Sequence, residues 1–152
     1  AAAASVYALF GIMFVVGTLA SSLSDRTGRE RIYVPACALA LVGAGLLFVI
    51  PGTTVSWLPW VFAVTFGIGM GIMPPVLFAA VADLFHGKSY GGIQGTVALG
   101  FSLGGAIGPW LAGHMHDVFG TYDPTLVLLV GALLASGILM VLAAPRRHAP
   151  IT

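Results

Sequence analysis

The chain has 152 residues, of which 59% are hydrophobic and 7% are charged, and its formal net charge is +1. About a quarter of the residues of a soluble domain are charged, so this little polar surface cannot cover such an apolar core in water. The composition therefore predicts a protein whose partner is the lipid bilayer, and it excludes nucleic acid, which requires a basic face.

Five long apolar runs divide the chain, and each approaches the ~20 residues that a helix needs to cross ~30 Å of hydrocarbon. They lack the alternating pattern of a membrane barrel, so strands are not expected. We predict an all-α membrane protein with transmembrane helices at about 1–23, 32–50, 57–82, 90–116 and 124–144, followed by a cytoplasmic tail at 145–152.

The basic residues predict the orientation of these spans. Three of the six lie at 25–31, between the first two spans, and the others are Lys88, Arg146 and Arg147. If successive connections alternate sides, all six fall on one side, which the positive-inside rule identifies as cytoplasmic. We therefore expect a multi-pass protein of the bacterial inner (plasma) membrane with a cytoplasmic C-terminus.

The single Cys37 lies within an apolar run, so the sequence predicts neither a disulfide framework nor a thiolate metal site. We expect no metal and no cofactor. The chain begins AAAASVYALF, with neither an initiating Met nor a basic leader, which indicates the interior of a larger protein.

Glycine is concentrated in the third and fourth spans. It recurs at every fourth position in Gly67-x-x-x-Gly71 and Gly100-x-x-x-Gly104-x-x-x-Gly108. Small residues on one helical stripe let helices approach closely, so these glycines are interpreted as helix-packing residues, with a sliding face as the alternative. We expect bending or local unwinding at the prolines within these two spans, Pro74, Pro75 and Pro109.

The stretch 17–31, GTLASSLSDRTGRER, resembles the cytoplasmic signature loop of the major facilitator superfamily, G-x-x-x-D-R-x-G-R-[RK]-[RK]. Ser21 stands where that motif usually has glycine, and Glu30 occupies a usually basic position. The residues that match the charged part of the motif are Asp25, Arg26, Gly28, Arg29 and Arg31. The resemblance implies two six-helix bundles that rock about a central substrate site.

Two downstream stretches resemble monocarboxylate-type and oxalate/formate-type members of this superfamily. They are 82–95, ADLFHGKSYGGIQG, and 108–122, which contains GPWLAG and HDVFGTY. This resemblance implies helices eight to twelve, in the C-terminal half of the carrier. As an alternative, Gly95-x8-Gly104-x3-Gly108-Pro109-x2-Ala112-Gly113 resembles the antiporter signature of the fifth helix, which implies helices two to six of a drug/proton antiporter.

On the C-terminal placement, the resemblance implies that the first, third and fourth spans face the cavity and that the second and fifth face lipid. Interhelical hydrogen bonds or lipid-facing positions are the alternative for any polar residue there. The candidate cavity-lining residues are Tyr7, Thr65, Met70, Gln94, Thr96 and Ser102.

We expect secondary active transport of a small organic solute by alternating access, with a monocarboxylate as a candidate substrate and symport as a candidate mode. Carboxylate carriers of this family are expected to hold a cation in the cavity, yet no span here has a basic residue in its middle. Either the missing N-terminal helices of the same carrier, its expected partners, supply the cation, or the substrate is not a simple carboxylate.

Two other classes remain open: a membrane protein without transport activity, and an intramembrane serine hydrolase. The hydrolase has support from G-x-S-x-G at 100–104, with Ser102 as nucleophile. That motif requires a strand–turn–helix context, whereas Ser102 is expected mid-helix, and His114 would lie ~18 Å along the same helix. We therefore do not expect an enzyme.

The resemblance also implies a role for the loop at 25–31 as half of a conformational latch. Asp25 is expected to meet the positive N-terminal end of a helix in the opposite bundle, while the arginines anchor to the cytoplasmic surface. Asp83, at the cytoplasmic end of the third span, is expected to pair with Lys88 or with the N-terminal end of the fourth span.

Overall fold

The computed structural model describes residues 2–52, 54–85, 87 and 90–143, and within them it contains helices and no strands. The five long helices are α1 (Ala2–Ala20), α3 (Arg29–Val49), α4 (Leu58–Leu84), α5 (Tyr90–Phe119) and α6 (Asp123–Ala143). All five are long and apolar enough to cross a membrane. The predicted all-α fold with five membrane-crossing helices is confirmed.

The first span continues helically beyond the predicted end at residue 23. A 3₁₀ turn, η1 (Ser21–Leu23), and a single α-helical turn, α2 (Ser24–Thr27), carry the chain to Gly28. Gly28 has φ +106°, a backbone conformation that residues other than glycine rarely adopt, and α3 starts at the next residue. The glycine therefore sets the tight reversal between α2 and α3.

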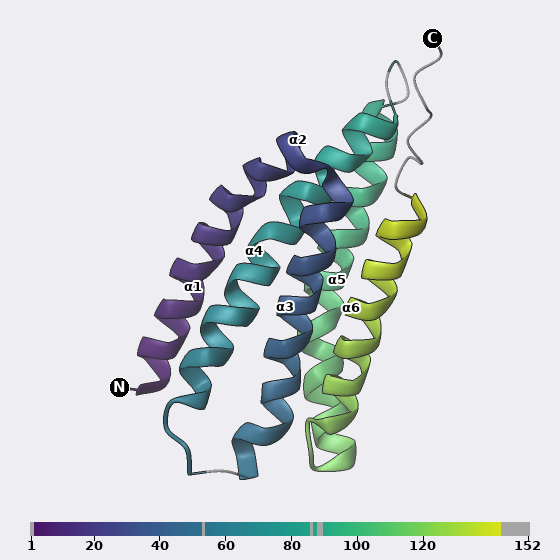
Figure 1. The fold of residues 1–152 in the computed structure, drawn as a ribbon. Helices are drawn as coiled ribbons and strands as arrows, with labels where there is room; N and C mark the ends of the chain where they lie inside the picture. Colours follow the sequence, from purple (N-terminus) through teal and green to yellow (C-terminus); the bar gives the residue numbers. More distant parts are fainter. Residues whose placement is uncertain (1, 53, 86, 88–89, 144–152) are drawn as a thin grey trace.

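Helix α4 lies between α1 and α3 and packs extensively against both (Figure 1). Some of its glycines contact α1 and others contact α3. A Cβ placed on Gly67 would lie 2.9 Å from the carbonyl oxygen of Phe10 in α1, and one placed on Gly69 would lie 2.7 Å from the carbonyl oxygen of Ala36 in α3. Gly71 meets the backbone of Phe14 even more closely. Only glycine allows these backbone-to-backbone approaches.

Helix α6 packs on the side of α3 that is turned away from α1, and this contact completes the buried core. Tyr33 and Ser136 share a hydrogen bond between the two helices, and the Cys37 thiol donates to the carbonyl oxygen of Leu133 at 3.0 Å. One face of α3 is therefore buried, while its other face exposes large side chains such as Val42.

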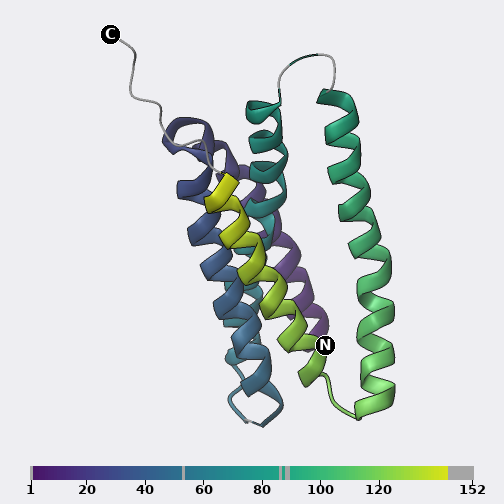
Figure 2. The same ribbon diagram turned by 90° about the vertical axis from the view of Figure 1, so that its right-hand side faces the viewer.

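Helix α5 stands apart from the other long helices (Figure 2), and none of its described residues is buried. It contacts α4 through the rings of Phe78 and Phe101, whose centroids are 6.3 Å apart. A Cβ built on any of three stripe glycines would meet nothing within 4 Å: Gly100, Gly104 and Gly108.

The helices continue through their prolines. Helix α4 is α-helical through Pro74 and Pro75, and α5 is α-helical through Pro109. Local unwinding, one of the two expected effects, is therefore not found at these positions, and bending stays a prediction. A proline removes one intrahelical hydrogen bond, and a long helix can remain helical there when the turns on both sides are intact.

Candidate functional site

The signature loop is organised around the Arg29 side chain, which bonds to three different residues. Its Nε donates to Asp83 Oδ2 at 2.7 Å, and its Nη1 donates to Ser24 Oγ at 2.8 Å and also pairs with Asp25 Oδ1. Only 21% of the Arg29 side chain is exposed, against 63% for Asp25 and 53% for Asp83. We refer to Asp25, Arg29 and Asp83 as the charge network.

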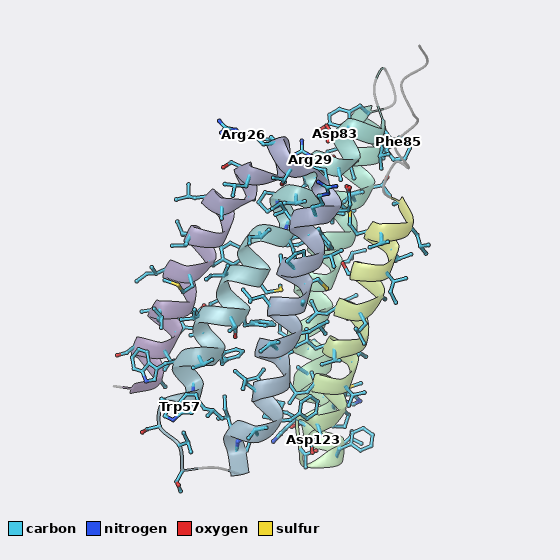
Figure 3. All side chains as sticks on the ribbon, in the orientation of Figure 1. Arg26, Arg29, Trp57, Asp83, Phe85 and Asp123 are labelled. Carbon is cyan, nitrogen blue, oxygen red and sulfur yellow. The ribbon has the colours of Figure 1, made fainter. Side chains whose placement is uncertain are left out.

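The charge network connects the start of α3 to the end of α4 (Figure 3). Asp83 accepts from Arg29, a partner that was not expected. Its pairing with Lys88 or with the start of α5 stays a prediction, because Lys88 lies outside the described residues. The two helices are antiparallel neighbours, so the first turn of one lies beside the last turn of the other. The opposite charges of Arg29 and Asp83 were the sequence signal from which this contact could have been predicted.

The other signature arginines do not join this network. Arg26 points outward from α2 (Figure 3), and Arg31 is exposed on the first turns of α3. Within the described part of the chain, neither forms an ion pair. A cavity of about 420 Å³ with both polar and apolar lining lies beside the network. Its lining includes Asp25, Arg26, Gly28, Arg29, Glu30 and Asp83.

A second cavity, of about 590 Å³, lies at the opposite end of the bundle between α1, α3 and α4. It is almost wholly apolar and is rich in aromatic side chains. The aromatic residues of its lining are Tyr7, Phe10, Trp60, Phe62 and Phe66. Phe62 and Phe66 stack with ring centroids 5.3 Å apart, and Phe10 stacks on Phe66 at 6.1 Å. The volume suits a drug-sized molecule.

Of the six cavity-lining candidates, only Tyr7 lines this apolar cavity. Thr65 donates to the carbonyl oxygen of Val61 in its own helix at 2.8 Å, and Met70 packs against the buried core of α3, α4 and α6. The structure therefore does not bring these three residues together.

The remaining three candidates lie on α5. Thr96 donates to the carbonyl oxygen of Gly92 at 2.9 Å, and Ser102 is exposed in the middle of the helix. The Gln94 Oε1 atom is buried without a hydrogen-bond partner among the described residues. Because Ser102 lies within a continuous α-helix, it does not have the strand–turn–helix setting that the hydrolase motif requires.

Sequence reasoning missed the aromatic cavity. Phe10, Phe62 and Phe66 lie within the apolar runs of the first and third spans, and their clustering depends on how α1 and α4 meet. The spacing of Phe62 and Phe66 by four residues, which places both rings on one helical face, was the available signal.

Among the described residues, no group of three or more His, Cys, Asp or Glu side chains could hold a metal ion.

Comparisons with known proteins agree on the class of protein. Residues 1–152 match the Major Facilitator Superfamily. The chain is 38% identical to Monocarboxylate transporter 13 of Rattus norvegicus over 84 residues, and 30% identical to a putative tartrate transporter of Agrobacterium vitis over 140 residues. It is also 30% identical over 99 residues to the multidrug transporter protein MdtP of Bacillus subtilis (strain 168).

These matches cover 54%, 91% and 65% of this chain, and 19%, 31% and 18% of the respective relatives. The chain therefore spans less than a third of the length of each relative. No solved structure matches it. With its five apolar helices and its match over residues 1–152, the chain is a multi-pass integral membrane protein that belongs to the major facilitator superfamily.

Proposed function

We propose that the chain is part of a secondary carrier that moves a small organic solute across the membrane by alternating access. The charge network is the observation that carries this proposal. It joins the loop between α2 and α3 to the end of α4, so the ends of these segments on this side of the membrane can move as one body. A bundle that rocks about a central site requires such rigid-body behaviour.

The five helices are proposed to be helices eight to twelve, in the C-terminal half of the carrier, with the charge network and the C-terminus in the cytoplasm of a bacterial cell. In this arrangement the missing N-terminal helices cover α5. The unfilled space beside Gly100, Gly104 and Gly108 supports this proposal, because a neighbouring helix could approach there as closely as α1 approaches α4.

A monocarboxylate is the first candidate substrate, since one relative is named a monocarboxylate transporter. A second relative is named for tartrate, a dicarboxylate, and supports only the broader class of carboxylates. The described parts of the spans contain no basic residue in their middle, so the missing helices would have to supply a cation for the carboxylate. A drug/proton antiporter is the second candidate. The relative named MdtP and the apolar aromatic cavity favour it, because a lipophilic solute needs no pairing cation.

Uptake by the full-length protein in proteoliposomes tests both candidates. A carboxylate carrier should accumulate labelled lactate or tartrate, and empty liposomes should not. An antiporter should instead export a lipophilic dye when an opposing proton gradient is imposed. Trp60→Ala, in the apolar cavity, should weaken dye transport more than the control Phe48→Ala, because Phe48 is an exposed aromatic residue of α3, a helix expected to face lipid. If neither solute class moves, the carrier proposal is wrong.

A further inference from the structure

A third cavity runs along the outer seam between α3 and α6, away from both sites described above. It has a volume of about 360 Å³. Small residues form its floor, namely Cys37, Ala38 and Gly137, and a Cβ on Gly137 would lie only 3.2 Å from the Cys37 Sγ atom. Large apolar side chains form its walls: the exposed Val34, Leu134, Ile138, Val141 and Leu142, and the partly buried Leu41. We refer to this cavity as the seam groove.

The seam groove offers no hydrogen bond to an occupant. The polar groups nearest to it are bonded within the protein: Tyr33 pairs with Ser136, and the Cys37 thiol donates to the Leu133 carbonyl. Only hydrocarbon fits such a lining without leaving a polar group unpaired. Since the groove lies on helices long and apolar enough to cross a membrane, the hydrocarbon available to fill it is an acyl chain of the surrounding bilayer.

A positive charge lies at one end of the groove. Arg31 precedes Val34 by three residues and Ala38 by seven, so it occupies the same stripe of α3, one turn nearer the membrane surface. Its side chain is exposed, and within the described residues it forms no ion pair, whereas Arg29 is fully engaged in the charge network. Arginine side chains in this position extend toward the headgroup region.

From this arrangement we propose that the seam groove and Arg31 form a binding site for one anionic glycerophospholipid. An acyl chain lies along the groove between α3 and α6, and Arg31 pairs with the phosphate of the headgroup. The complementarity of charge at the end of an apolar groove selects an anionic lipid over a zwitterionic one, because the zwitterionic headgroup carries its own cation to compete with Arg31.

Native mass spectrometry of the full-length carrier, with phosphatidylglycerol or phosphatidylcholine added, tests the preference of the site for an anionic headgroup. One arginine near an anionic surface contributes about 1 kcal/mol, so Arg31→Gln should reduce the preference for phosphatidylglycerol about fivefold. Arg31→Lys should retain most of it. Arg26→Gln is the matched control, because it removes one positive charge of the same loop region and Arg26 does not line the groove. An equal loss of preference in the Arg26→Gln control would overturn the assignment to Arg31.

Photocrosslinking tests the groove itself. Phosphatidylglycerol that carries a diazirine on its acyl chain should label peptides of α3 and α6 around Ala38 and Ile138. Ala38→Phe should abolish this labelling, because the added ring fills the groove from an exposed position and leaves the core intact. Circular dichroism of the variant controls for folding. Labels distributed evenly over all helices, or disulfide and crosslink evidence that a second copy covers the seam, would overturn the proposal.

Discussion

The Nε atom of Arg29 lies 2.7 Å from the Oδ2 atom of Asp83, although 54 residues separate them in the chain. This contact fastens the first turn of α3 to the last turn of α4. Because both partners are partly exposed, the bond contributes little to the free energy of unfolding, about 1 kcal/mol or less. In the proposed carrier its role is therefore expected to be geometric, because the contact fixes which segments move together.

Breaking this contact should affect transport more than stability. Asp83→Asn and Arg29→Gln should each lower the uptake rate of the full-length carrier severalfold and change the unfolding free energy by no more than about 1 kcal/mol. The double variant should be no worse than the poorer single variant, because both remove the same contact. Strictly additive losses of uptake rate would show that the two residues act independently.

Gly71 should not tolerate a methyl group. Gly71→Ala places a Cβ against the backbone of Phe14, so we expect a destabilisation of about 1–3 kcal/mol from overpacking between α1 and α4. Gly45→Ala is the matched control, because Gly45 also lies within a long helix but has nothing within 4 Å. It should gain up to about 1 kcal/mol from helix propensity. Thermal unfolding in detergent measures both, and similar melting temperatures for the two variants would contradict the close packing.

The glycine stripe of α5 should respond differently. In the full-length carrier, Gly104→Leu should lower uptake strongly if the missing helices pack against this stripe, as proposed. Gly131→Leu, on α6, is the control, since its position is also open in this structure. Equal uptake by the two variants would argue against a covering helix at α5.

The hydrogen bond between Tyr33 and Ser136 should make a small, measurable contribution to the packing of α6. Tyr33→Phe removes it and should cost about 0.6 kcal/mol, the average for interhelical hydrogen bonds in membranes. Tyr7→Phe should cost nothing, because the Tyr7 residue is 77% exposed. Steric-trapping measurements of unfolding in bicelles resolve a difference of this size, and equal stability of the two variants would contradict the prediction.

The spans were predictable because hydrophobic length is a local property of the sequence. Thus α4 was expected at 57–82 and is found at Leu58–Leu84. The contacts of Arg29 and Phe66 were not predictable from the sequence, because they depend on which helix ends and which helix faces meet in three dimensions. The signature motif identified Arg29 as important, but its partner Asp83 is provided by a different helix, and no local pattern links the two residues.

Gradient-driven accumulation in proteoliposomes tests the central claim most directly. The full-length protein, reconstituted with an imposed proton gradient or counter-substrate gradient, should accumulate its solute above the external concentration and release it when the gradient is dissipated. The Asp83→Asn variant should accumulate the same solute more slowly. Solute retention that is equal with and without protein, or accumulation that does not depend on any gradient, would contradict the assignment as a secondary carrier.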